Sequence, residues 1–390
     1  MRIGFDNEKY QKIQSEHIKE RISQFDGKLY LELGGKLFDD HHASRVLPGF
    51  MPDSKLRMFQ KISDSIEIVI VISATDIEKN KKRADLGITY DEDVLRLRGE
   101  FQNRGFMVGS VVITHYNGQP AASAFRQRLE RDGIKTYCHY LIEGYPHNVS
   151  LIASDEGFGK NDYVETERPL VIVTAPGPGS GKMAVCLSQL YNENKRGVRA
   201  GYAKFETFPV WNLPLKHPVN IAYEAATADL NDVNMIDPFH LEAYGKIAIN
   251  YNRDIEIYPV LNALFEGIYG SNPYKSPTDM GVNMVGFCIS DDEACCEASK
   301  NEIVRRYYDA TNKMARGACN EEEISKIQML FNQAKINTDF RRTTVAAKNY
   351  KKETGHTSSA IEMEDGTIIT AKSSELLGCS AALIINVTKY

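Results

Sequence analysis

A glycine-rich loop between an apolar strand and an amphipathic helix is the feature that most constrains the fold. Residues 170–173 (LVIV) form a short apolar run typical of a buried parallel strand. The loop 175–182 follows, and apolar residues then recur at helical spacing until Gly197 ends the pattern. The order strand, glycine loop, lysine, helix is that of a phosphate-binding loop, whose backbone N–H groups and helix N-terminus face an anion.

The phosphate-binding hypothesis assigns cofactor-binding roles to Gly177, Gly179, Ser180, Gly181 and Lys182. The match to the P-loop pattern G-x-x-x-x-G-K-[ST] is imperfect, because Pro176 replaces the first glycine and Met183 replaces the hydroxyl residue that binds Mg²⁺. Pro176 and Pro178 also remove N–H donors from the loop. The alternative is a tight turn that needs glycine only for close packing, but three glycines directly before a lysine exceed what a turn requires.

Composition narrows the class of protein. The chain has 390 residues, 42% hydrophobic and 25% charged, which is ordinary for a soluble globular protein of two or three domains. A net charge of −5 without a basic block gives no support for a nucleic-acid partner. Seven irregularly spaced cysteines, the lack of a signal-peptide core and the lack of a long apolar run predict reduced thiols in the cytoplasm, with no membrane partner. A homo-oligomer stays open.

Strand and helix patterns alternate along most of the chain. We expect strands at 29–33, 66–72, 108–114, 134–140, 170–173 and 198–205, and helices at 7–25, 55–62, 91–103, 118–132 and after the glycine loop. This alternation predicts an α/β fold, with parallel sheets covered by helices on both faces in a P-loop or Rossmann-like three-layer region. The expected units are an N-terminal α/β half (1–165), a P-loop-like α/β half (166–335) and the start of a C-terminal α+β domain (336–390).

The last part of the chain has a different pattern. Two long helices are expected after the capping residues near 290 and 320, and a short helix at 343–354. Asp365 and Gly366 then mark a hairpin between 358–363 and 367–372. The apolar run 381–387 reaches Tyr390 without a stop signal. We therefore expect the chain to be truncated within its C-terminal domain, leaving an apolar face uncovered.

Two further residues are candidates for chemistry together with Lys182. Lys204 lies at the end of the expected strand 198–205, at the carboxyl edge of a parallel sheet, although a surface lysine at a strand end is the alternative. Asp237 follows the apolar run 233–236, which resembles the strand before a Mg²⁺-binding carboxylate. We assign catalytic roles to Lys182, Lys204 and Asp237, and a metal-binding role to Asp237, and expect them to share one site.

Purely structural roles are the alternative for the residues of this acidic segment. Asp237 precedes Pro238 and is equally suited to cap a helix through 240–244. His240 is a candidate ligand or base, yet a single histidine is more often a hydrogen-bonded structural residue.

Other motifs are weaker. Gly34, Gly35 and Lys36 make a second glycine–lysine turn, followed by residues 39–45 (DDHHASR), which we interpret as a solvated or phosphate-facing loop with Ser44 and Arg45. The sequence has no H-E-x-x-H motif and no other zincin spacing, which speaks against a zinc protease and predicts no zinc. A serine hydrolase elbow G-x-S-x-G is also missing.

Five segments together resemble a bacterial domain-of-unknown-function family, number 1846. They are LELGGKLFDDHHASRVLPGF, APGPGSGKMAVCLSQLY, AKFETFPVWNLPLKHPVN, AATADLNDVNMIDPFHLEAYG and SPTDMGVNMVGF. The resemblance spans essentially the whole chain. It implies a protein that continues beyond this C-terminus but brings no established activity. Some members are labelled ATP-dependent zinc peptidases, and the missing zinc motif here argues against that label.

The order of strand, glycine loop, Lys182, helix and the strand that carries Lys204 is also similar to P-loop ligases of the dethiobiotin synthetase kind. Those enzymes use ATP to activate a carboxylate or carbamate. The sequence thus favours an enzyme that binds ATP, another nucleotide or a phosphorylated small molecule, with Mg²⁺, in a ligase- or kinase-type reaction. A non-catalytic phosphate-metabolite-binding or assembly protein is the alternative.

Overall fold

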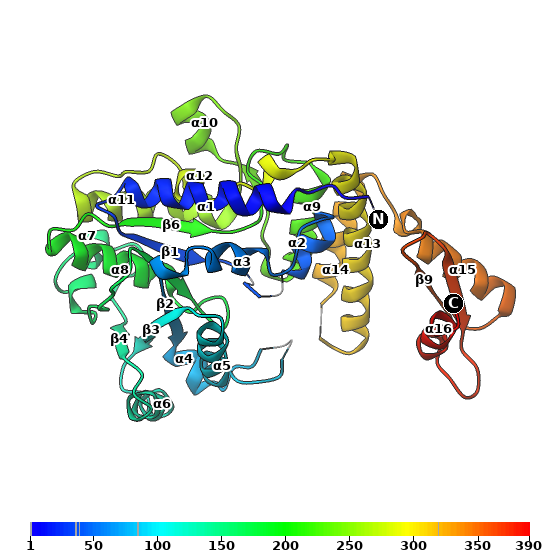
Figure 1. The fold of residues 1–390 in the computed structure, drawn as a ribbon, viewed down its shortest axis with the longest axis horizontal. Helices are drawn as coiled ribbons and strands as arrows, with labels where there is room; N and C mark the ends of the chain where they lie inside the picture. The colour runs from blue at the N-terminus through cyan, green and yellow to red at the C-terminus, as the bar shows by residue number, and fades with distance from the viewer. Residues whose placement is uncertain (1, 36, 39, 84–85, 319) are drawn as a thin grey trace.

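One six-stranded parallel sheet lies at the centre of the molecule (Figure 1). The computed structural model describes residues 1–390 except 1, 36, 39, 84–85 and 319. The sheet has the order β4-β3-β2-β5-β1-β6, and each neighbouring pair is parallel. Its strands are β1 (Leu29–Leu33), β2 (Ile66–Ser73), β3 (Met107–Tyr116), β4 (Thr136–Tyr140), β5 (Leu170–Thr174) and β6 (Gly201–Phe205).

The strand order corrects the expectation of two sheet-forming halves. β5 lies between β2 and β1, and β6 lies on the far side of β1, so segments 1–165 and 166–335 interleave in a single sheet. The order also differs from the Rossmann order 3-2-1-4-5-6. The α/β class with a parallel sheet and flanking helices is confirmed.

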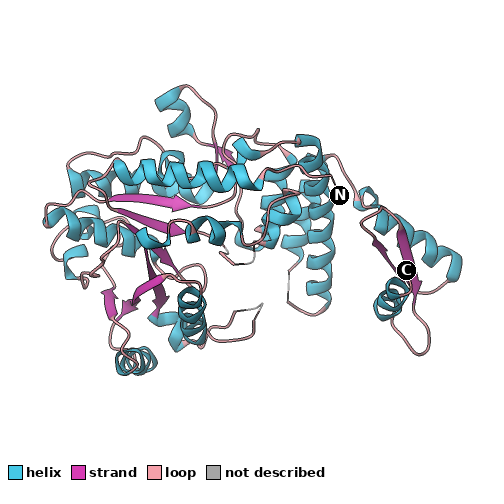
Figure 2. Ribbon diagram, viewed as in Figure 1, coloured by secondary structure: helices cyan, strands magenta, loops and turns pink. Residues whose placement is uncertain are grey.

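Helices cover both faces of this sheet, which explains why its central strands are mostly apolar (Figure 2). All eight residues of β2 are buried. Alternate residues of β2 enter two separate hydrophobic clusters, Ile68 and Ile70 in one and Val69 and Val71 in the other. The first cluster includes residues of α1 (Asn7–Ser23), α3 (Ser54–Gln60), α4 (Ala74–Glu78), α5 (Tyr90–Asn103) and α6 (Pro120–Arg131). The second includes residues of α7 (Val149–Ile152), α8 (Lys182–Lys195), α11 (Asn252–Tyr269) and α12 (Pro277–Met280).

A third cluster is helical and lies beside the sheet. It joins the start of α1 with α2 (His41–Val46), α9 (Pro218–Ala226), α13 (Asp292–Ala315) and α14 (Glu321–Ala334). The segment expected as a solvated loop is therefore mostly helix α2, because the Asp40 side chain caps it by accepting a hydrogen bond from the Ala43 N–H at 3.1 Å. Lys36 and Asp39 lie outside the described residues.

Short elements complete the main body. α10 (Pro238–Tyr244) projects from it and is flanked by β7 (Asn234–Ile236) and β8 (Ile249–Tyr251), which pair antiparallel in a sheet of their own (Figure 1). The 3₁₀ turns are η1 (Ser63–Ser65), η2 (Phe158–Lys160), η3 (Ala228–Leu230), η4 (Val285–Cys288) and η5 (Thr338–Phe340). Within the described residues, no helix is both long and apolar enough to cross a membrane.

The C-terminal segment forms a small unit beyond α13 (Figure 1). It consists of α15 (Arg342–Thr354), β9 (Ser358–Glu362), β10 (Ile368–Lys372) and α16 (Cys379–Thr388). β9 and β10 pair antiparallel, so the hairpin that Asp365 and Gly366 indicated is confirmed. Neither α15 nor α16 has a buried residue, and the packing of this unit is shallow.

Candidate functional site

The glycine loop lies where the connections of the sheet diverge. From β2 the chain continues outward to β3, whereas from β5 it crosses β1 to reach β6. In open α/β sheets, ligands bind at such a switch point, outside the carboxyl ends of the strands. The loop leads from β5 into α8, and Gly181 is the N-cap of that helix with φ +87°. Gly179 also has positive φ, +76°, so two left-handed residues flank Ser180.

Close packing explains part of the glycine content. The Thr114 hydroxyl, at the end of β3, donates to the Ser180 carbonyl at 2.6 Å. A Cβ atom on Gly181 would lie 3.2 Å from the Thr114 methyl group, and one on Gly177 would overlap the Tyr90 hydroxyl. Gly179 has open space around its Cβ position, so packing does not account for it.

Several donors in the loop have no protein partner. In the described part of the chain, the N–H groups of residues 179–183 donate to no protein acceptor. The buried Ser180 hydroxyl has no hydrogen-bond partner among the residues that the structure describes. Lys182, at the first position of α8, has no ion-pair partner among the described residues. An anion at this helix N-terminus would satisfy all of these groups.

Lys204 lies in a buried cluster of charges at the end of β6. Its ammonium donates to both carboxylate oxygens of Asp254, at 2.7 and 2.8 Å, and to the Tyr251 hydroxyl. The Glu206 carboxylate is 3.3 Å from the same ammonium. Burial lowers the pKa of Lys204, but the charges of Asp254, Glu206 and Glu32 outweigh burial and raise it, so the lysine stays charged. The alternative of a surface lysine is wrong, because the Lys204 side chain is only 11% exposed.

Glu206 is the titratable group of this cluster. Burial, together with the charges of Asp254 and Glu32, raises the pKa of Glu206 to about 7, against the opposing effect of Lys204. A carboxyl group with a pKa near 7 can accept or donate a proton at physiological pH, as general acid–base catalysis requires.

Glu32 connects the Lys204 cluster to helix α8. It is opposite Val173 of β5 in one register and opposite Lys204 of β6 in the other. The Glu32 carboxylate accepts a hydrogen bond from the Tyr202 hydroxyl at 2.7 Å. Burial and then the charge of Glu32 raise the pKa of Cys186, in the second turn of α8. Because Val173 packs with α8 in one hydrophobic cluster, the register puts Glu32 and Lys204 on the face of the sheet that α8 covers.

A cleft of about 390 Å³ opens beside the Lys204 cluster. Its wall combines the charged cluster with aromatic rings and amide side chains, contributed by α1, the segment after β6, the α10 excursion and the η4 region. The lining side chains include Lys204, Glu206, Asp254, Trp211, His240 and Asn250. Such a mixture of apolar surface and a few convergent polar groups is typical of small-molecule sites.

The structure gives Asp237 the capping role. One carboxylate oxygen accepts from the His240 N–H at 3.0 Å, and the other accepts from the Thr278 N–H and hydroxyl, at 3.2 and 2.6 Å. The expectation that Asp237 shares one edge of the parallel sheet with Lys182 and Lys204 is wrong, because β7 belongs to a separate antiparallel pair and does not end at that edge. Asp237 is fully buried and its carboxylate is engaged on both oxygens.

His240 is also held by neighbours. Its Nδ1 is 3.1 Å from the Ser276 hydroxyl, and its ring packs on Tyr244 and Trp211. The ring lines the cleft, so it is part of the wall that a ligand would touch.

Family models cover both parts of the chain. The N-terminal model of domain-of-unknown-function family DUF1846 matches residues 3–335, and the C-terminal model of the same family matches residues 339–390. The chain belongs to the DUF1846 family. The division between the two models falls just before α15, where the small C-terminal unit begins.

Curated bacterial relatives agree with this assignment. A UPF0371 protein of Corynebacterium urealyticum is 59% identical over 389 residues, which is 100% of this chain and 78% of the relative. UPF0371 proteins of Streptococcus pyogenes and Streptococcus thermophilus are 57% and 58% identical over 387 and 386 residues, each 99% of this chain and 78% of the relative. These names state no ligand or reaction, so a function for this DUF1846 chain is argued from its geometry.

Sequence reasoning missed three carboxylates of the charged cluster. Glu206 follows Lys204 by two positions and so lies on the same side of its strand, which is a signal that could have been used. Asp254 is 50 positions beyond Lys204 and reaches it through α11. Glu32 carries no motif and becomes notable only through its register with Lys204.

Proposed function

We propose that this chain binds a phosphorylated small molecule, with the phosphate on the glycine loop and the rest of the ligand extending toward the Lys204 cleft. The observation that carries this proposal is the set of unused donors at the start of α8. Within the described part of the chain, the loop N–H groups, the buried Ser180 hydroxyl and Lys182 have no protein partner, and together they form the donor set that an anion needs.

The spacing of the sheet supports a shared ligand. β5, which leads into the glycine loop, and β6, which carries Lys204, are separated by one strand, so their ends are about 10 Å apart at the usual strand spacing. A nucleotide or a sugar phosphate is long enough to bridge such a distance. Glu32 lies along that path and would face the polar part of the ligand.

The cleft chemistry favours an enzyme, and the reaction class we propose is a nucleotide-dependent ligase or kinase reaction. Glu206 would take a proton from the attacking group of the substrate, since its pKa of about 7 leaves it partly ionised at neutral pH. Lys204 would hold a positive charge next to the reacting atoms. Asp237, the residue proposed from the sequence for Mg²⁺, does not fit that ion because both of its carboxylate oxygens are engaged, and Met183 brings no side-chain oxygen at the position of the P-loop hydroxyl.

Calorimetric titration tests the phosphate site. The probes are ATP, GTP, inorganic phosphate and sugar phosphates. Lys182→Ala should weaken binding of the best probe by about 1.5–3 kcal/mol, the contribution of a hydrogen bond to a charged group. Ser180→Ala should weaken it in the same direction. Lys195→Ala, in the last turn of the same helix, is the matched control and should leave affinity unchanged. If no probe binds, or if Lys182→Ala and Lys195→Ala behave alike, the proposal is wrong.

A non-catalytic phosphate-metabolite-binding protein is the second candidate. The missing hydroxyl at Met183 and the engaged Asp237 favour it, because both departures remove the groups that assist Mg²⁺-dependent turnover. Release of phosphate or nucleoside diphosphate from a bound nucleotide separates the candidates. Turnover that is lost in Glu206→Gln with binding retained supports the enzyme, and binding without any turnover supports the second candidate.

A further inference from the structure

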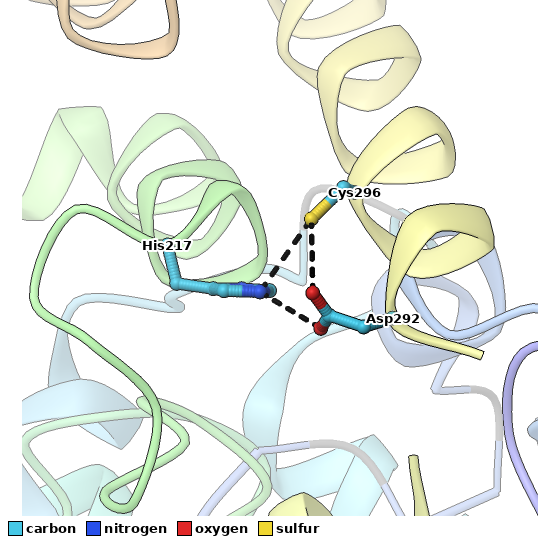
Figure 3. A group of neighbouring side chains, drawn as sticks. All are labelled: His217, Asp292 and Cys296. Carbon is cyan, nitrogen blue, oxygen red and sulfur yellow. Dashed lines mark hydrogen bonds and ion pairs between the residues drawn. The ribbon is translucent and has the colours of Figure 1, made fainter. Parts of the chain in front are cut away.

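A histidine, an aspartate and a cysteine converge between α9 and α13 (Figure 3), and none of the three lines the Lys204 cleft or belongs to the glycine loop. His217 Nε2 is 3.0 Å from Asp292 Oδ1. The Cys296 Sγ is 3.5 Å from His217 Nε2 and 3.7 Å from Asp292 Oδ2. One ligand atom from each residue lies within 4.8 Å of the others, and Asp292 directs Oδ1 toward His217 and Oδ2 toward Cys296.

Rigid elements hold these three side chains. His217 is the N-cap residue of α9, and Asp292 and Cys296 are four positions apart at the start of α13, on one side of that helix. α9 and α13 both contribute buried residues to the helical cluster. The arrangement is thus built into the packing of two helices rather than carried by a loop.

The separations match those of a tetrahedral metal site. Zinc binds nitrogen and carboxylate oxygen at about 2.0–2.2 Å and thiolate sulfur at about 2.3 Å, so two such ligands at a tetrahedral angle lie about 3.3–3.6 Å apart. The two distances to Cys296 Sγ, 3.5 and 3.7 Å, are close to that range. The nitrogen–oxygen distance of 3.0 Å needs only a small opening.

The donor set selects the kind of metal. One imidazole nitrogen, one thiolate and one carboxylate suit a borderline-soft ion such as Zn²⁺ better than Mg²⁺ or Ca²⁺, which prefer oxygen ligands. The Asp292 side chain is 62% exposed, so solvent reaches the cluster from that side. Three protein ligands with an open fourth position are typical of zinc sites that bind water or a substrate.

We propose that His217, Asp292 and Cys296 bind a zinc-type transition metal ion, with solvent as the fourth ligand. Binding requires the thiol proton of Cys296 to leave to solvent. In the metal-free chain, His217 Nδ1 accepts a hydrogen bond from the Val219 N–H at 3.3 Å, so the imidazole proton is on Nε2. Metal binding at Nε2 moves this proton to Nδ1, and the hydrogen bond from Val219 is lost. The ligands come from two segments 75 and 79 positions apart, which explains why no zinc spacing is visible in the sequence.

Metal titration of the full chain after removal of metal with a chelator tests this site. We expect one equivalent of Zn²⁺ to bind, and one equivalent of Co²⁺ to give the charge-transfer absorption of a cobalt–thiolate bond. Cys296→Ser should abolish that absorption and, like His217→Asn, weaken Zn²⁺ binding by at least about 100-fold, because loss of an outer-shell partner alone costs about 10–100-fold. His217→Asn keeps the helix cap, since asparagine is a favoured N-cap residue.

Matched controls separate the site from adventitious thiol or imidazole binding. Cys379→Ser removes another partly exposed free cysteine, in α16, and His41→Ala removes an exposed histidine of α2. Both should bind Zn²⁺ and Co²⁺ as the unmodified chain does. The proposal is overturned if the chain binds no stoichiometric metal, if Cys296→Ser keeps the cobalt–thiolate absorption, or if Cys379→Ser loses it.

Discussion

At the scale of single residues, the chemistry of the cleft depends on one buried lysine among three carboxylates. Lys204 pairs directly with Asp254 and Glu206, and Glu32 lies close enough to affect the pKa of both Lys204 and Glu206. A single positive charge cannot compensate three negative ones in a buried site, so one carboxyl group is driven toward its protonated form. Glu206 is that group.

Glu206 should therefore make stability depend on pH in a defined window. Its pKa is about 7 in the folded chain and 4.5 in the reference state, so the folded state binds more protons between these values. The stabilisation is fully present below about pH 4.5 and is lost as the pH rises through about 7. At about 1.4 kcal/mol per unit of pKa difference, the full effect is about 3–4 kcal/mol, of which roughly 2–3 kcal/mol falls between pH 5 and pH 8.

Urea unfolding at pH 5 and pH 8 measures this effect. Glu206→Gln should flatten the difference between the two pH values and make the chain more stable at pH 8 than the unmodified chain. Glu242→Gln, at an exposed position of α10, is the control and should leave the pH dependence as it is. Equal pH dependence in the unmodified chain and in Glu206→Gln would contradict the prediction.

Residue types alone identified Lys204 but not its partners. A lysine at the end of an expected strand can be placed at the carboxyl edge of a parallel sheet from the sequence. Asp254 contacts Lys204 from the first turn of α11, and Glu32 lies beside Lys204 on the neighbouring strand β1. Neither position can be deduced from the local sequence pattern. Asp237 shows the opposite error, since a carboxylate next to an apolar run resembled a metal ligand and is a helix cap.

At the scale of elements, two glycines of the loop separate the energetic cost of backbone conformation from that of close packing. Gly179 and Gly181 both have positive φ, but only a Cβ on Gly181 would meet Thr114. An L-residue in the left-handed region costs about 1–2 kcal/mol. We expect Gly179→Ala to destabilise the chain by about that amount and Gly181→Ala by more, as measured by urea unfolding. Equal losses would mean that Thr114 can move aside.

Helix α10 gives a second test at this scale. Asp237→Ala removes the cap and both bonds to Thr278, so it should destabilise the chain by about 1–2 kcal/mol. Asp237→Asn keeps an accepting oxygen for the cap and should cost less. Thermal unfolding of the two variants measures this. If Asp237→Asn leaves stability unchanged but removes Mg²⁺-dependent ligand binding, the metal role returns in place of the cap.

Most elements can be predicted from the sequence because apolar runs, helix-capping residues and glycines at helix ends are local signals. β1 was expected at residues 29–33, and the helix after the glycine loop ends before Gly197. The segment after Gly35 was misjudged, since α2 has only six residues and a histidine pair at its start, and depends on Asp40 for its cap. Strand order could not be deduced, because it depends on which crossovers pack and not on any single segment.

At the scale of the molecule, burial differs sharply between the main sheet and the C-terminal unit. Every residue of β1 and β5 is buried, whereas α15 and α16 have no buried residue, and Leu376 is 91% exposed. Local opening needs little free energy where few apolar contacts are lost. We expect hydrogen exchange of residues 358–388 to be complete well before that of β1 and β5, as followed by mass spectrometry. Equal protection of the two regions would contradict this.

The place of β1 between β5 and β6 has a consequence for synthesis on the ribosome. β1 is made first among the strands, yet its neighbours in the sheet are the fifth and the sixth. A nascent chain of 165 residues can pair β2, β3 and β4. The backbone groups of β1 stay unpaired at this stage, because its partners β5 and β6 have not been synthesised. At about 5–20 residues per second, the wait for β5 is on the order of 10 s. During that time β1 is an exposed apolar strand, open to chaperones and to β1 segments of neighbouring nascent chains.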